Sequence, residues 1–178
     1  MNDPGIIETV RLVLRRPTES DVHEIFSRYA SDAEATRYMG FRTHASIDDT
    51  RAFLRQSAAE WGRWEAGPFL VRLRADNSLI GSTGLHFETP LRAMTGYIFA
   101  RDAWGMGYAT ETLSAIVGIT RERRVQRLYA LCHTEHRVSA HVLEKCGFVC
   151  EGILRSYMEF PNLSPGRASD VFCYAITM

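Results

Sequence analysis

The stretch Trp104-Gly105-Met106-Gly107-Tyr108-Ala109-Thr110-Glu111 lies between a strand-like run, residues 96–100, and a helix-like run from Tyr108 to about Glu122. A glycine-rich turn that opens a helix presents backbone N–H groups that the helix cannot pair internally, beside the positive end of the helix dipole. Gly105 and Gly107 carry no Cβ that would hold a ligand away from the backbone. The stretch therefore predicts a helix start that can bind a phosphate group.

Two common phosphate-binding patterns fit this stretch poorly. The phosphate loop of nucleotide hydrolases has a Lys and a Ser or Thr after its last glycine, whereas this chain continues Tyr108-Ala109. The dinucleotide fingerprint needs a small residue in place of Thr110 and an acidic residue at the end of the next strand, yet the strand expected over residues 127–132 ends in His and Thr. Taken alone, the two glycines are equally compatible with a tight turn that binds nothing.

The same stretch resembles the acyl-CoA pyrophosphate loop of the GNAT superfamily of N-acetyltransferases, whose pattern is Gln/Arg-x-x-Gly-x-Gly/Ala. Gly107 and Ala109 match the last two fixed positions, and Trp104 stands where Gln or Arg is usual. The form Trp-Gly-x-Gly-Tyr-Ala-Thr-Glu is typical of the branch that resembles the ribosomal-protein alanine N-acetyltransferases. Other segments that resemble this branch stand in the expected order at residues 9–15, 80–85, 96–97 and 143–148.

Of the 178 residues, 46% are hydrophobic and 24% are charged, which fits one globular domain over residues 1–178. Residues 1–8 are expected to form a mobile lead-in. The 21 basic and 21 acidic residues balance, so no basic excess favours a nucleic-acid or membrane partner. The sequence shows no basic-then-apolar signal and no apolar run of spanning length, so a cytoplasmic location is expected. The four cysteines lack paired ligand spacing, so reduced thiols and no metal are expected.

Apolar periodicity outlines the expected fold. Strands are predicted over residues 10–14, 69–74, 79–87, 93–100, 127–132, 149–159 and 170–177. Helices are predicted after Pro17, over 32–39, from Ser46 to about Glu65, over 108–122 and after Cys132. The helical crossover between strands 93–100 and 127–132 makes that pair parallel. With the resemblance, the expected fold is a GNAT-like α+β, three-layer fold. Its mixed, mostly antiparallel sheet has six to seven strands and a splayed parallel pair, flanked by about four helices.

The resemblance implies that acetyl-CoA is the co-substrate and where it would bind. The pantetheine arm would insert between strands 96–100 and 127–132, where backbone groups of Ile98, Phe99 and Ala100 would pair with its amides. The pyrophosphate would lie on the loop and helix start. The residues implied there are Trp104, Gly105, Met106, Gly107, Tyr108, Ala109 and Thr110.

The helix after Cys132 carries a variant of the family's second signature, Asn-x-x-Ser, as His136 and Ser139. Ser139 matches the position proposed in this branch to protonate the leaving thiolate, and the alternative is a hydroxyl that bonds back to its own helical turn. The imidazole of His136 can donate to a pantetheine carbonyl, although it is bulkier than Asn.

The general base stays open at this stage. Many relatives carry a Glu two residues before the Gly-Tyr pair, and Met94 stands there in this chain. Glu159 lies in the segment where relatives of the ribosomal type place a catalytic acid. The other candidates are His86, Glu88 and His44. Alternatively, water carries the proton out and no single base is needed.

The sequence leaves the acceptor equally open. Tyr38, His44 and His86 are expected on the acceptor side, with a small-molecule or peptide amine as substrate. Two rival functions remain: a catalytically silent acyl-CoA-binding module, and a nucleotide-binding domain that uses the same glycine turn. A homodimer is also left open.

Overall fold

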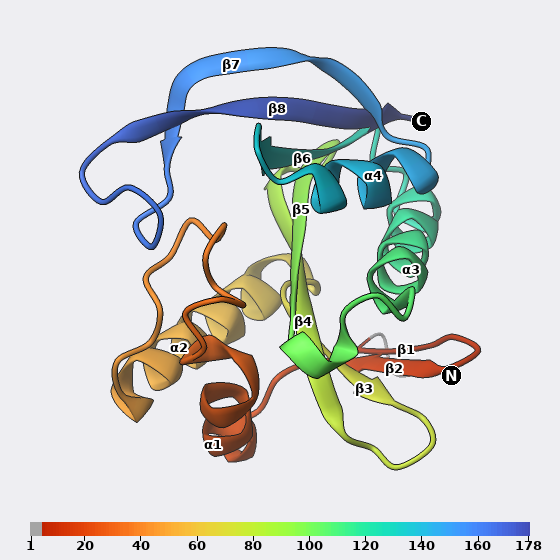
Figure 1. Ribbon diagram of the computed structural model, residues 1–178. Coiled ribbons are helices and arrows are strands. Elements are labelled where there is room, and N and C mark those ends of the chain that lie inside the picture. Colours follow the sequence, from red (N-terminus) through yellow and green to blue (C-terminus); the bar gives the residue numbers. More distant parts are fainter. Residues whose placement is uncertain (1–4) are drawn as a thin grey trace.

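Eight strands form one mixed sheet in the computed structural model, which describes residues 5–178 (Figure 1). Their order across the sheet is β1-β2-β3-β4-β5-β6-β8-β7, and every neighbouring pair is antiparallel except β5 and β6. The mixed, mostly antiparallel sheet is confirmed, with one strand more than expected. The strands are β1 (Ile6–Glu8), β2 (Leu12–Arg15), β3 (Phe69–Leu73), β4 (Leu79–Thr89), β5 (Arg92–Phe99), β6 (Arg127–His133), β7 (Val149–Glu159) and β8 (Ala168–Thr177).

Four α-helices cover the two faces of the sheet. Figure 1 shows α1 and α2 on one side of β4 and β5, and α3 and α4 on the other. None of the helices within residues 5–178 is long and apolar enough to cross a membrane. The helices are α1 (Val22–Ile25), α2 (Ile47–Trp64), α3 (Tyr108–Glu122) and α4 (Arg137–Lys145), with short helical turns η1 (Glu19–Asp21), η2 (Phe26–Ala30) and η3 (Arg101–Ala103).

Two expectations about the first 40 residues need correction. The helix predicted over residues 32–39 is wrong, because this segment forms successive turns. The Asp32 carboxylate accepts the N–H groups of Glu34 and Ala35, as at a helix start, but the Thr36 carbonyl accepts the Met39 N–H and Asn162 Nδ2 instead of continuing a helix. A mobile lead-in was expected over residues 1–8, yet Ile6–Glu8 pairs with β2 as β1. Residues 1–4 lie outside the described residues.

The parallel pair of β5 and β6 is joined only at its beginning. Residues 92–94 lie opposite residues 127–129, and the pairing then ends, although β5 continues to Phe99 and β6 to His133. At about 3.3 Å per residue, roughly 16 Å of β5 faces β6 without strand pairing. The expected splayed pair is therefore present.

The two faces of β5 belong to different apolar layers. Phe99 packs with α3 residues such as Leu113, whereas Ile98 packs with Ile25 of α1 and Leu54 of α2. Side chains alternate along a strand, so positions 94 and 96 share the α1/α2 face with Ile98. This assignment decides which groups face an acceptor below.

A buried ion cluster connects the start of the first helical segment to β2 and β3. Asp21 is 4% exposed and accepts hydrogen bonds from Arg15 Nη1 at 2.9 Å and Arg72 Nη2 at 3.3 Å. The N–H and hydroxyl of Thr18 donate to the same carboxylate, each at 2.8 Å. Burial alone would raise the pKa of Asp21, but the hydrogen bonds from Arg15 and Thr18 outweigh it and lower the pKa to about 2.

Replacing Asp21 with Asn should lower the free energy of unfolding by roughly 3 kcal/mol at neutral pH, because Arg15 loses its buried anion and Arg72 is left with Glu24 as its carboxylate partner. The folded carboxylate titrates near pH 2, whereas an unfolded Asp titrates at about 3.9. Its contribution is therefore complete above pH 4 or so and is lost as the pH falls toward 2. Urea unfolding of both proteins at neutral and acidic pH should show their difference shrinking in acid, and a constant difference would contradict this account.

Candidate active site

The glycine loop before α3 is shaped by two residues in the left-handed region. Gly105 has φ 74°, and Gly107, the N-cap of α3, has φ 79°, which glycine adopts without the cost that a Cβ imposes. The helix's hydrogen bonding begins with the Glu111 N–H, which donates to the Gly107 carbonyl at 3.1 Å. The N–H groups at positions 108–110 therefore have no acceptor inside the helix and lie at the positive end of its dipole. Such a helix start favours an anionic ligand.

Trp104 connects this loop to the end of β5. Its indole Nε1 donates to the Phe99 carbonyl at 2.9 Å. The side chains of Trp104 and Met106 are about half exposed, so the loop remains accessible from solvent. The contact places the helix start beside the part of β5 that pairs with β4 but not with β6, where Ile98 and Phe99 lie, followed by Ala100.

The turn between β1 and β2 supports the same loop, which the sequence did not indicate. Arg11 Nε donates to Glu111 Oε2 at 2.7 Å, and Arg11 Nη1 donates to the Met106 carbonyl at 3.0 Å. The hydroxyl of Thr9 and the N–H of Arg11 donate to the other carboxylate oxygen at 2.6 and 2.9 Å. Burial would raise the pKa of Glu111, but these hydrogen bonds lower it below its ordinary value. The first turn of α3 is thus attached to the sheet through an ionised carboxylate.

Ser139 lies across from β5 and bonds to Tyr97. The two hydroxyl oxygens are 2.9 Å apart, and the Tyr97 hydroxyl also lies 3.3 Å from the Ser139 carbonyl. Burial raises the pKa of Tyr97 well above its ordinary value, so the phenol stays protonated and can donate. Cys132, near this pair, is only 3% exposed. Burial raises the pKa of its thiol, so the thiol is not activated as a nucleophile.

The rings of Tyr38 and His136 stack on each other. This contact brings together a residue predicted to bind the acceptor amine and a residue predicted to bind acetyl-CoA. Their ring centroids are 4.4 Å apart with an interplanar angle of 21°. His133 packs beside both, at 5.3 Å from Tyr38 and with Phe160 edge-on at 4.8 Å. Burial, and then the neighbouring His133, lower the pKa of His136, so its imidazole is neutral at neutral pH.

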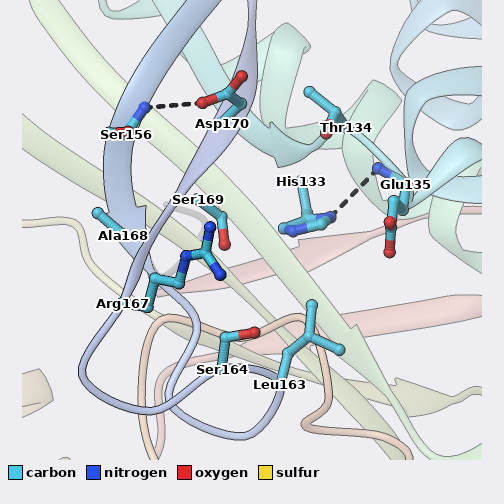
Figure 2. Close-up of a pocket in the computed structure, with 10 residues that line it drawn as sticks. All are labelled: His133, Thr134, Glu135, Ser156, Leu163, Ser164, Arg167, Ala168, Ser169 and Asp170. Atoms are coloured by element: carbon cyan, nitrogen blue, oxygen red, sulfur yellow. Dashed lines mark hydrogen bonds between the residues drawn. The ribbon is translucent and has the colours of Figure 1, made fainter.

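A hollow of about 490 Å³ opens at the end of β6. Figure 2 shows His133 and Glu135 on one side of it and Arg167 and Ala168 on the other. The Glu135 N–H lies 3.2 Å from His133 Nδ1, so Nδ1 accepts and the imidazole proton is on Nε2. The hollow is lined by polar and charged groups from β6, β7, β8 and the connection between β7 and β8.

The connection between β7 and β8 is attached to the segment that carries Tyr38. Asn162 Nδ2 donates to the carbonyls of Thr36 and Phe41, each at 2.8 Å, and Asn162 Oδ1 accepts the Thr43 N–H at 2.8 Å. One amide side chain therefore satisfies three backbone groups on the facing segment. The two walls around the end of β6 are fixed relative to each other by these bonds.

Three of the candidate bases already have other partners. His44 Nδ1 lies 2.8 Å from the Thr50 hydroxyl at the start of α2, and burial lowers its pKa. The Glu159 carboxylate accepts the Gly166 N–H at 2.8 Å and so closes the turn after β7. Glu88 accepts the Tyr129 hydroxyl at 2.5 Å, and this bond and Arg92 lower its pKa although burial opposes them. The structure does not bring these three to Ser139.

His86 has a different setting. It lies on β4 directly opposite Met94, and its Nδ1 is 2.7 Å from Glu60 Oε2 on α2. Both strand positions are on the α1/α2 face of the sheet. Glu60 was not singled out from the sequence, because a carboxylate on a helix surface carries no signal of its partner.

These parts together suit one kind of chemistry. An extended, amide-bearing molecule with a phosphate end would find the edge of β5 that faces β6 without strand pairing after residue 94, and N–H groups at the start of α3 that the helix does not use. A hydroxyl pair, Ser139 and Tyr97, lies beside that path and can donate a proton to a leaving atom. The hollow at the end of β6 offers a second ligand access from the side.

Comparison with known proteins agrees with this geometry. The acetyltransferase (GNAT) domain family matches residues 11–149. The uncharacterized N-acetyltransferase YoaA of Bacillus subtilis is 33% identical over 163 residues, 90% of this chain and 91% of that protein.

Two solved structures have the same fold. A GNAT-family acetyltransferase from Bacillus anthracis superposes with a TM-score of 0.83 at 26% identity, over 97% of this chain and 98% of that one. RimL, a ribosomal L7/L12 alpha-N-protein acetyltransferase in complex with coenzyme A, gives 0.84 at 21% identity over the same shares. The family match covers most of the chain, and the chain belongs to the GNAT family of N-acetyltransferases.

Proposed function

We propose that this enzyme transfers an acetyl group from acetyl-CoA directly to a primary amine within a ternary complex. The observation that carries the proposal is the early end of the pairing between β5 and β6, beside a helix start with unused N–H groups. One extended thioester with a pyrophosphate fits both features at once. The coenzyme A complex of RimL, which has the same fold, supports this choice of donor.

In the proposed complex the backbone performs most of the donor binding. Pantetheine amides pair with backbone groups around Ile98–Ala100, as an added strand would. The pyrophosphate lies on the N–H groups that follow Gly105, and His136, a neutral donor, lies along the arm. A backbone N–H near Ile98 is placed to stabilise the oxyanion that forms when the amine attacks the thioester carbonyl.

Ser139 is the proposed proton donor to the departing thiolate. The Tyr97 and Ser139 hydroxyl oxygens are 2.9 Å apart, and in the proposed step the phenol donates to Ser139 Oγ, which orients this hydroxyl and stabilises its oxygen as the proton leaves. Holding the amine and the thioester together supplies the rest of the rate, because attack becomes effectively unimolecular.

The acceptor is proposed to enter through the hollow at the end of β6 and to present a small-molecule or peptide amine. The carboxylates of Glu135 and Asp170 line this hollow together with the Arg167 side chain, and the two carboxylates are proposed to bind a cationic amine. Tyr38 is proposed as its aromatic wall. The hydrogen bonds of His44 and Glu159 favour positioning roles for these two residues rather than proton transfer.

Two measurements on the purified protein test this function. Acetyl-CoA at about 100 times its Kd should add roughly 2.7 kcal/mol of stability and raise the Tm by several degrees, whereas ATP and NAD should not. Thiol release in the presence of an amine library separates an enzyme from a silent acyl-CoA-binding module. Stabilisation by ATP or NAD alone would contradict the donor assignment, and binding without release on every amine would contradict catalysis.

Replacing Gly107 with Ala should weaken acetyl-CoA binding by about tenfold or more, because a Cβ in the left-handed region costs on the order of 1–2 kcal/mol and displaces the N–H groups that follow. The matched control is Gly118→Ala in the same helix, where a Cβ meets nothing within 4 Å. Calorimetric titration of both variants checks this. Equal affinities in the two variants would show that the loop does not bind the donor.

Replacing Ser139 with Ala should lower kcat by about 100-fold while the Kd for acetyl-CoA changes little, because protonation of the thiolate is lost and the backbone contacts remain. Tyr97→Phe retains the Ser139 hydroxyl and removes its donor, so a smaller loss is expected. Stopped-flow thiol release at saturating acetyl-CoA distinguishes the two. A Ser139→Ala enzyme with unchanged kcat would remove this residue from the mechanism.

A further inference from the structure

The Glu60–His86 pair has the geometry of an oriented imidazole base. His86 Nδ1 lies 2.7 Å from Glu60 Oε2, and the two side chains are 37% and 24% exposed. A carboxylate at Nδ1 fixes both the ring orientation and the tautomer, with the proton on Nδ1. Nε2 then carries the free lone pair of the neutral ring, which is the state a proton acceptor needs.

The free nitrogen faces a part of the sheet that has no side chains. A Cβ built on Gly84 would lie 2.4 Å from His86 Nε2, so the imidazole lies directly over Gly84. Gly84 is paired across the strands with Gly96, and a Cβ on Gly96 would meet nothing within 4 Å. The surface next to Nε2 is therefore open, and it is built from two facing glycines.

This open surface is on the side of the sheet opposite α3 and the glycine loop that precedes it. His86, Gly96 and Ile98 all face the α1/α2 layer. A donor whose pyrophosphate lies at the start of α3 and whose arm lies between the splayed strands can place its sulfur beside Ser139 and its acyl carbon toward the α1/α2 face. Gly96 precedes Ile98 by two residues, or about 7 Å along the strand, a gap that a water molecule can bridge.

We propose that His86, oriented by Glu60, is the base that removes the proton from the acceptor ammonium before attack. The proposal rests on the proposed acetyl transfer and names the group that this reaction still lacks. Among the other candidate bases, Glu88 and Glu159 are acids that accept hydrogen bonds from Tyr129 and Gly166, and His44 lies against Thr50 at the start of α2, not on the strand beside Gly96. Glu60 acts through the imidazole and is a positioning residue.

The proton and bond balance is complete without another reactant. One proton passes from the ammonium nitrogen to His86 Nε2, directly or through one water, and is later released to solvent. The neutral amine attacks the thioester carbonyl carbon, so that a C–N bond forms and the C–S bond breaks. After attack, the nitrogen releases a second proton to solvent. The departing thiolate takes a proton from the Ser139 hydroxyl, and a proton from solvent then restores that hydroxyl. The products are the amide and the free thiol of CoA.

The test uses three single variants of the full chain. His86→Asn retains a donor near the position of Nδ1 for Glu60 and removes Nε2. Glu60→Gln retains the volume of the side chain and removes the charge. His141→Gln is the matched control, because His141 is an exposed histidine 3.8 Å from Glu144 on α4, away from β4.

For His86→Asn we expect kcat to fall by about 100-fold at neutral pH, with the Kd for acetyl-CoA and the Tm unchanged. For Glu60→Gln we expect a smaller fall in kcat, because the imidazole keeps Nε2 but loses the carboxylate that orients the ring. His141→Gln should match the wild type throughout.

Two results would overturn the inference while leaving the acetyltransferase function intact. One is a wild-type kcat in His86→Asn. The other is a loss of kcat that is accompanied by a lower Tm and by weaker acetyl-CoA binding, because such a combination indicates a purely structural contact. A wild-type protein that binds acetyl-CoA but acetylates no amine in the library would overturn the proposed function and this inference together.

Discussion

The early end of the pairing between β5 and β6 is the constraint on which the rest of the structure depends. Backbone N–H and C=O groups on the facing edges of these strands lose their strand partner after residues 94 and 129. Such groups are rarely left without a partner, so the splayed region favours water or an extended ligand. The crossover through α3 makes the pair parallel and also places the start of that helix beside the splayed strands. Pairing, helix start and glycine loop therefore form one arrangement.

The donor and acceptor sides are stabilised by different parts of the chain. Thr9 and Arg11 attach the glycine loop and the first turn of α3 to the first hairpin through Glu111. Asn162 attaches the connection between β7 and β8 to the segment that carries Tyr38. In both cases one polar side chain, Glu111 or Asn162, makes several hydrogen bonds and so fixes the orientation of the segment that it contacts. The segments that would contact the donor and the segments that would contact the acceptor are therefore held in place by separate sets of hydrogen bonds.

Local patterns explain what could be predicted from the sequence. The helix over residues 108–122 and its glycine start follow from apolar periodicity and from glycine chemistry, and both are present. The acceptor wall was less predictable, because the turns after Asp32 are bonded by Asn162, which is 126 positions from Thr36 in the sequence. Arg11 and Glu111 are 100 positions apart, and such a contact has no trace in local sequence.

The same limit applies inside the site. The hydroxyl of Ser139 and the ring of His86 could be singled out by residue type and position. Their partners, Tyr97 and Glu60, could not, because they are defined by the packing of α4 on β5 and of α2 on β4.

Hydrogen–deuterium exchange with and without acetyl-CoA tests the central claim most directly, because that claim concerns backbone N–H groups. Peptides that cover residues 98–100 and 105–110 should exchange more slowly with the ligand, while peptides from β1 to β3 should change little. Protection confined to other segments, or none at saturating acetyl-CoA, would contradict a donor site between β5, β6 and the start of α3.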